Sequence, residues 1–194
     1  MLNSYPQELL QANCQSIVEE ILKENYVSMS VQNFILSESE RTKIDCSIVF
    51  SNEWDDIFIC GHGDGAIDAL YTAMISQFSD KFISMRRVSF DDFTLNVKFK
   101  NSVRKSASPV EVKLALKNAS ERNIYFSAES CSIIKAAISV VVSACEYLIN
   151  AERTILVLRD LIDNAYDRGR TDLVVNYRDK MVELVRITSY EEVL

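Results

Sequence analysis

The chain has 194 residues, enough for one domain with additional elements or for two small domains. Hydrophobic residues make up 48% and charged residues 25% of it, a globular composition that excludes the disordered class. The formal net charge of −7 argues against a nucleic-acid-binding protein, because that affinity depends mainly on Lys and Arg contacts with phosphates.

Cysteine usage and hydropathy indicate a reducing, aqueous compartment. The cysteines are odd in number, form no C-x-x-C pair and lie within apolar runs, so we expect reduced, buried thiols at Cys14, Cys46, Cys60, Cys131 and Cys145. The N-terminal residues lack a basic start followed by an apolar stretch, and no segment approaches about 18 uninterrupted apolar residues. We therefore expect a cytoplasmic protein with no membrane partner.

An amphipathic helix and three strands are predicted first. Apolar residues recur at helical spacing over 6–24, with Pro6 suited to the first turn. Alternation with a period of two then predicts strands at 27–36, 43–51 and 54–60. A glycine cluster follows the third strand and leads directly into the next helix.

The same order, three strands and a helix, continues along the chain. A helix of about four turns is predicted over 66–78. The segment 82–90 resumes the alternation as a strand or as a lead-in to one. Further strands and a second helix are predicted at 93–99, 109–116, 123–126 and 132–150.

The C-terminal residues predict a helical hairpin. Two helical patterns, 152–168 and 171–185, are separated by Gly169, which suits a helix C-cap, while Thr171 suits the next N-cap. Their apolar stripe must be buried against the N-terminal helix or a second subunit. The stripe consists of Leu158, Leu161, Ile162, Ala165, Leu173, Tyr177, Met181 and Leu184.

Shifting the sequence by 67 residues places small residues on small ones and apolar residues on apolar ones. The matched pairs include Phe58 with Tyr125, Ile59 with Phe126, Gly61 with Ala128, Gly63 with Ser130, Ile67 with Ile134 and Ala69 with Ala136. We therefore expect an α+β fold with two βββα repeats and pseudo-two-fold symmetry, each sheet covered by helices on one face. The expected parts are an N-terminal helix (1–26), a repeat domain (27–150) and a C-terminal helical hairpin (151–194).

Most catalytic and metal-binding constellations cannot be written with these residues. His62 is the single histidine, so neither H-E-x-x-H nor a paired Cys/His ligand set exists, and the chain has no G-x-S-x-G elbow or P-loop lysine. The adjacent carboxylates Asp55-Asp56 and Asp91-Asp92 would point to opposite faces of a strand. We expect no catalytic residue, no metal and no cofactor.

Three of the four glycines lie between positions 61 and 65, at a strand-to-helix junction. The run Gly61-His62-Gly63-Asp64-Gly65-Ala66 fits G-x-G-x-x-A, but three alternating strands precede it, unlike a Rossmann βαβ unit. Glycines let main-chain N–H groups approach a ligand, and a helix N-terminus attracts a carboxylate or phosphate. A tight turn without a ligand is the alternative.

The segment GDGAIDALYTAM at 63–74 resembles the G-N/D-G-P-V-D-A motif of the C-terminal regulatory, or allosteric dimerisation, domain of α-isopropylmalate synthase and citramalate synthase. The resemblance covers roughly 27–150 and includes DDF at 91–93 and SIIKAA at 132–137. It implies a homodimer that binds leucine or isoleucine. The catalytic TIM barrel of those enzymes has no counterpart in this chain.

Carried over, the resemblance implies a ligand site with one half from each repeat. The implied residues are Gly63, Asp64, Gly65, Ala66, Ile67 and Ala69 in the first half, and Ser130, Cys131, Ser132, Ile133 and Ala136 in the second. The second motif lacks the family's glycines and Asp and has Phe126, Ala128 and Ser132 at those places; Ala66 replaces the proline of the first. These departures imply that the half of the ligand site from the second repeat is closed or altered.

Three functions are compatible with these patterns. The leading hypothesis is a non-catalytic, stand-alone regulatory-domain homologue that senses a branched-chain amino acid and modulates a separate synthase-type enzyme. A ligand-free dimerisation or scaffold module, recruiting a partner through its terminal helices, is the second. A nucleotide-binding enzyme built on the glycine loop is the third, and it would require stabilisation by a nucleotide.

Overall fold

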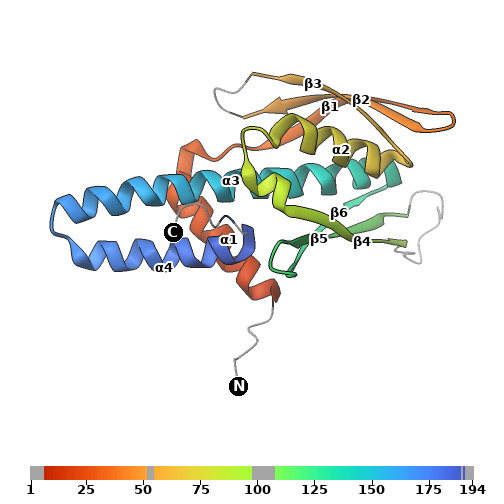
Figure 1. Ribbon diagram of the computed structural model, residues 1–194. Helices are drawn as coiled ribbons and strands as arrows, with labels where there is room; N and C mark the ends of the chain where they lie inside the picture. Colours follow the sequence, from red (N-terminus) through yellow and green to blue (C-terminus); the bar gives the residue numbers. More distant parts are fainter. Residues whose placement is uncertain (1–6, 52–54, 98–107, 189, 191–194) are drawn as a thin grey trace.

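The computed structural model describes residues 7–51, 55–97, 108–188 and 190. It is an α+β structure with two three-stranded antiparallel sheets, as the sequence predicts for the fold class. Figure 1 shows the sheets as outer layers with helices α2 and α3 between them, while α3 and α4 project together to one side. The predicted Pro6 start of the first helix lies outside the described residues.

The first sheet is a meander of β1 (Met29–Glu38), β2 (Thr42–Phe50) and β3 (Ile57–Gly63), followed by α2 (Ala66–Phe78). Along β2 every second residue is buried, because one face of the sheet packs on helices and the other is open. The helix predicted over 66–78 is confirmed at both ends.

The second sheet repeats this order after the 3-10 turn η2 (Ile83–Arg87). Its strands are β4 (Val88–Val97), β5 (Val110–Asn118) and β6 (Asn123–Ser130). The segment 82–90 is therefore a 3-10 turn and the start of β4. Both first strands have ten residues and a register shift after their third residue, between Val31 and Asn33 in β1 and between Phe90 and Asp92 in β4.

Helix α3 (Ile133–Asp167) is one continuous helix of 35 residues. The prediction of separate helices meeting at residue 150 is wrong, because the apolar face that covers the sheet continues without a break into the face that α4 (Thr171–Thr188) covers. The predicted boundary between 150 and 151 thus falls inside a helix. The C-cap of α3 is Arg168, and the predicted capping residue Gly169 follows it with φ +65°, the left-handed conformation that closes a helix end.

Thr171 is not the N-cap of α4. The carbonyl of Arg170 accepts the hydrogen bonds of Leu173 and Val174, at 3.1 Å each, so Arg170 takes the cap position, and α4 begins at Thr171, where the predicted helical pattern begins. Arg170 also forms a two-pronged hydrogen-bonded ion pair with Asp172. This pair lies at the tip of the hairpin.

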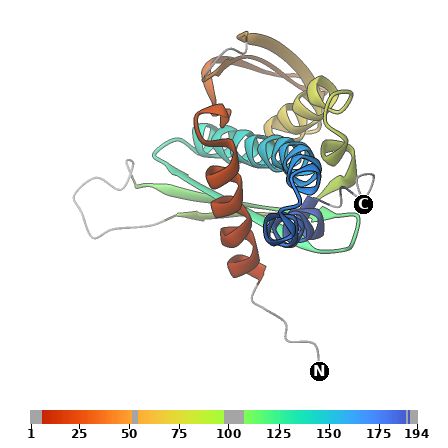
Figure 2. The same cartoon turned by 90° about the vertical axis from the view of Figure 1, so that its left-hand side faces the viewer.

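Helix α1 (Gln7–Leu22), with the short 3-10 turn η1 (Lys23–Asn25), crosses α3 and reaches β6 and α4 (Figure 2). It contacts both α3 and α4, as one of the two sequence-based alternatives for covering the hairpin stripe requires. Within the stripe, Leu158, Ala165, Met181 and Leu184 are buried, whereas Leu161, Ile162, Leu173 and Tyr177 are half-buried. The half-buried residues include those toward the hairpin tip.

Helix α3 is the central element of the core. It contacts both sheets and the other three helices, and many of its side chains are fully buried. Among the described residues it alone has the length and apolar composition to cross a membrane, but 67% of its most apolar stretch is buried inside the protein, as in the core helix of a soluble protein.

Candidate functional site

The glycines before α2 allow a strand and a helix to pack in close contact. A β-carbon on Gly61 would overlap the main chain of Ala69 and lie 2.7 Å from Cβ of Ala73. One on Gly63 would overlap the main chain of Ala69 and approach the Asp68 carboxylate. Gly61 and Gly63 are therefore needed for packing, which accounts for two of the three clustered glycines.

Gly65 has a different role. It is the N-cap of α2 in an extended conformation, with φ −161°, and a β-carbon there would meet nothing within 4 Å. No side chain caps this helix, whereas the Ser132 hydroxyl caps α3 by accepting the Lys135 N–H at 3.3 Å. The first-turn N–H groups of α2 are consequently available to a ligand.

The carboxylate of Asp68 lies beside this helix start. Its Oδ2 accepts the N–H of Asp64 at 2.9 Å, while the Asp64 side chain points outward, 93% exposed, 3.7 Å from Nε of Arg41. The structure thus places one carboxylate and a set of free main-chain N–H groups at the same helix end. Such a pair matches the two charges of an amino-acid zwitterion.

A pocket of about 290 Å³ opens at this helix start, and we call it the junction pocket. It lies between the first turns of α2 and α3 and the strand β4, so residues distant in sequence form one site. Its lining is mostly apolar and consists of Gly65, Ala66, Ile67, Asp68, Phe90, Phe93, Ile133, Ile134 and Ala137.

The junction pocket contains part of the predicted site. Four predicted residues line it: Gly65, Ala66, Ile67 and Ile133. The other predicted residues do not line it, because they pack under the helix starts or face away: Gly63, Asp64, Ala69, Ser130, Cys131, Ser132 and Ala136. Residues from the starts of both α2 and α3 line this pocket.

Sequence reasoning missed five lining residues: Asp68, Phe90, Phe93, Ile134 and Ala137. Four of them had a usable signal, since they belong to the quoted motifs: Asp68 to GDGAIDALYTAM, Phe93 to DDF, and Ile134 and Ala137 to SIIKAA. Phe90 packs edge-on against Tyr71 of α2, with ring centroids 5.8 Å apart. That contact depends on the tertiary structure.

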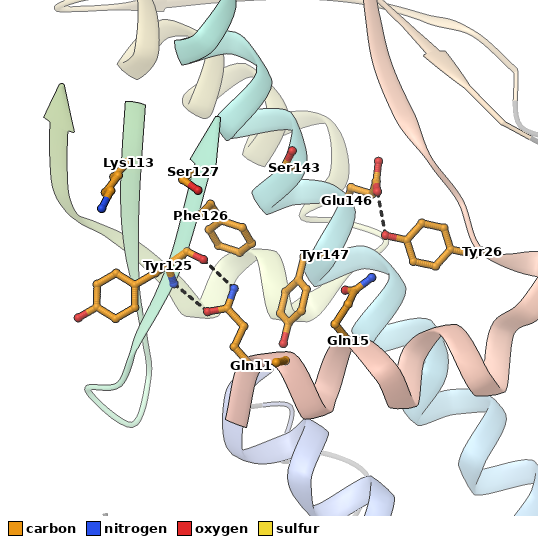
Figure 3. Close-up of a pocket in the computed structure, with 11 residues that line it drawn as sticks. Gln11, Gln15, Tyr26, Lys113, Tyr125, Phe126, Ser127, Ser143, Glu146 and Tyr147 are labelled. Atoms are coloured by element: carbon orange, nitrogen blue, oxygen red, sulfur yellow. Dashed lines mark hydrogen bonds between the residues drawn. The ribbon is translucent and has the colours of Figure 1, made fainter. Parts of the chain in front are cut away.

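A larger cavity of about 730 Å³ lies on the opposite side of α3, between α1 and the edge of β6 (Figure 3). We call it the edge cavity. Aromatic, amide and hydroxyl side chains line it: Gln11, Ala12, Gln15, Tyr26, Lys113, Tyr125, Phe126, Ser127, Ser143, Glu146 and Tyr147. Phe126 therefore adds bulk here, packed edge-on against Tyr147 with centroids 5.6 Å apart, and leaves the junction pocket unaffected.

Two hydrogen-bonded groups fix the walls of the edge cavity (Figure 3). The Gln11 amide donates to the carbonyl of Tyr125 at 2.7 Å and accepts the N–H of Tyr125 at 3.0 Å. The Glu146 carboxylate accepts the Tyr26 hydroxyl at 2.8 Å and the Met29 N–H at 2.6 Å. Burial, together with this bond to Glu146, raises the pKa of Tyr26 to about 12.

Two reactive side chains of the described residues, His62 and Cys60, lie on the open face of the first sheet. His62 is exposed on the open face of the first sheet, opposite Lys43 in β2. Cys60 is exposed on the same face, and its hydrogen bond to Asp45 raises the pKa of the thiol, which makes it a weaker nucleophile at neutral pH. Across 7–51, 55–97, 108–188 and 190, no cluster of His, Cys, Asp and Glu could hold a metal ion.

The cysteine prediction is correct for three residues and wrong for two. Cys14, Cys46 and Cys145 are buried, and burial raises the pKa of each thiol, to about 12, 11 and 12. Cys60 and Cys131 are exposed, because Cys60 lies on the uncovered sheet face and Cys131 lies in the turn before α3. Apolar neighbours in sequence did not distinguish the two faces of a strand.

No protein-family model matches the chain, and the search of curated proteins finds no similar sequence.

Proposed function

We propose that this protein is a non-catalytic, stand-alone regulatory module that binds a small branched-chain amino acid, leucine or isoleucine, in the junction pocket. In this proposal it forms a homodimer in the cytoplasm and modulates a separate enzyme of the 2-isopropylmalate or citramalate synthase type. Ligand binding regulates such a partner only if the ligand has different affinities for two arrangements of the dimer.

The observation that carries the proposal is the meeting of both helix starts at one apolar pocket beside free N–H groups. The ligand carboxylate would accept hydrogen bonds from the first turn of α2, at Ala66 and Ile67, and its ammonium group would lie against Asp68. A branched aliphatic side chain fits among Phe90, Phe93 and the isoleucines of α3. Each part of the ligand then has a complementary group.

We further propose that the two sheet-and-helix units are internal repeats with pseudo-two-fold symmetry. Both middle strands have nine residues, and both first strands have ten with a register shift at the same place. The interval between the third strand and its helix is also equal, since Gly63 precedes Ala66 as Ser130 precedes Ile133. The junction pocket would then lie where the repeats meet.

A thermal-shift titration tests amino-acid binding. Leucine or isoleucine at ten times its dissociation constant should raise the midpoint of unfolding by about 3 to 6 °C. The corresponding 2-oxo acid, 4-methyl-2-oxopentanoate, lacks the ammonium group and should stabilise the protein less.

A matched pair of substitutions at Gly65 tests whether the stabilisation by leucine arises from binding in the junction pocket. Gly65→Phe fills the pocket mouth, and Gly65→Ala leaves the pocket open; both are compatible with the fold, because a β-carbon there meets nothing within 4 Å. Stabilisation by leucine should disappear in the first variant and persist in the second. Stabilisation that persists in both would move the site elsewhere.

A scaffold without a ligand is the second candidate, and one observation favours it. The hairpin of α3 and α4 carries exposed apolar side chains, with Tyr166 74% and Val175 59% exposed, in a position suited to a protein partner. This candidate expects no stabilisation by any amino acid. It also expects Tyr166→Ser to weaken association with the partner while the fold is kept.

A further inference from the structure

The edge of β6 beside the edge cavity is partly occupied by a group that imitates a peptide. The Gln11 carboxamide both donates to and accepts from the main chain of Tyr125, as the residue of a neighbouring antiparallel strand would do. The order of the sheet is β4-β5-β6, so β6 is an edge strand, and no strand among the described residues pairs with its other side. This edge can therefore bind peptide groups.

Ser127 is the next residue of β6 whose main-chain N–H and C=O groups point away from β5. Main-chain groups alternate in direction along a strand, so Ser127, two residues after Tyr125, also directs its N–H and C=O away from β5. Ser127 lines the edge cavity, whose volume of about 730 Å³ leaves room for additional chain. An unpaired strand edge beside an open cavity is the geometry of strand addition.

We propose that this edge binds a short extended segment of a partner protein, which adds a strand beside β6 opposite Ser127. The site lies on the other side of α3 from the junction pocket, so this inference does not depend on amino-acid binding. The main chain of the segment forms hydrogen bonds with Ser127 and so extends the row of bonds along β6 that Gln11 begins at Tyr125.

Charge on the outer face selects an acidic residue opposite Ser127. Lys113 is the cross-strand neighbour of Ser127, and its ammonium group is 53% exposed with Glu111 at 3.9 Å. Because the Ser127 side chain is small, an acidic side chain on the added strand can reach over it to Lys113. Glu111 and Glu129 face each other two residues further along, on the same face of the sheet, and disfavour a second acid there.

The inner face of the edge cavity selects apolar residues on either side of that acid. Side chains adjacent to it along an extended segment point to the opposite face, toward α3. There they meet the rings of Phe126 and Tyr147 and the hydroxyl of Ser143 (Figure 3). The recognised pattern is therefore apolar, acidic, apolar.

Three blocked peptides of one length test the proposal by NMR titration of the full chain. They are Ac-TVEVT-NH2, its lysine counterpart Ac-TVKVT-NH2, and the first peptide with its glutamate nitrogen methylated. The acidic peptide should shift the amide resonances of Ser127 and its neighbours and bind about threefold more tightly than the lysine peptide. The protein carries a net charge of −7, so non-specific attraction would give the opposite order. Methylation should weaken binding about tenfold, because in an antiparallel pair it removes the N–H that donates to the Ser127 carbonyl.

Two substitutions at one position separate main-chain pairing from side-chain effects. Ser127→Pro removes an outward N–H that β5 does not use, so the sheet should form and binding should be lost. Ser127→Ala keeps that N–H and should bind as the unmodified protein does. Lys113→Glu should reverse the preference between the acidic and the lysine peptide.

Any of three results would overturn the proposal: no saturable shift at millimolar acidic peptide, equal binding of the methylated peptide, or shifts that map to β1 or β4. The methylated peptide keeps the test decisive if Ser127→Pro does not fold.

Discussion

The main chain of Ala69 in α2 passes so close to Gly61 of β3 that no β-carbon can be accommodated between them. This contact places the start of α2 against the sheet and thereby positions one wall of the junction pocket. The pocket and the stability of the first sheet-and-helix unit depend on the same two residues.

Alanine substitution should cost much more stability at Gly61, which packs against α2, than at Gly65, which is the N-cap of α2. Gly61→Ala should lower the free energy of unfolding by about 3 kcal/mol or prevent folding, because α2 must move off the sheet. Gly65→Ala should cost less than about 1 kcal/mol, because its new β-carbon points into open space. Urea denaturation measures both, and equal costs would contradict the packing role of Gly61.

The buried carboxylate of Glu152 should stabilise the link between the two units. It is 2% exposed and accepts hydrogen bonds from the N–H of Ile83 at 3.0 Å and from the N–H and hydroxyl of Ser84 at 2.8 and 2.6 Å. Glu152→Ala leaves these buried donors unpaired and should cost about 3 kcal/mol in urea denaturation. The control Asp163→Ala, at an exposed position of the same helix, should change the stability by less than about 0.5 kcal/mol.

Thiol labelling should distinguish the five cysteines of the native protein. At pH 8 the exposed Cys60 and Cys131 should react with a disulfide reagent, whereas the three buried thiols, with raised pKa values, should react only after unfolding. Asp45→Asn should speed labelling of Cys60, since the carboxylate holds the pKa of that thiol up. Rapid labelling of all five would contradict the burial.

The ion pair between Arg170 and Asp172 at the hairpin tip should make a pH-dependent contribution to the free energy of unfolding. Arg170 lowers the pKa of the Asp172 carboxyl from 3.8 to about 2. Because the folded-state pKa is the lower one, the stabilisation is complete above about pH 4 and is lost as the pH falls through 2. NMR titration of the carboxyl should show this pKa, and Arg170→Ala should return it to about 3.9. An unchanged pKa in that variant would assign the shift to another group.

The period-two and helical patterns predicted the order of six strands and the helix at 66–78, because each sheet has one buried and one open face. They did not predict the length of α3, since an apolar helix face continues smoothly from a sheet contact to a helix contact. Gly65, Ala66, Ile67 and Ile133 of the pocket could be located because they lie at the helix starts. Phe90 could not, because it reaches the pocket only through the pairing of β4 with β5 and its contact with Tyr71.

Methyl NMR can show whether a branched-chain amino acid occupies the junction pocket, as we propose. Titration of leucine into protein labelled at the isoleucine methyl groups should shift Ile67, Ile133 and Ile134, which line that pocket, and leave Ile44 and Ile155 in the core unchanged. Absence of any shift at saturating leucine and isoleucine, or shifts confined to isoleucines outside the pocket, would contradict the claim.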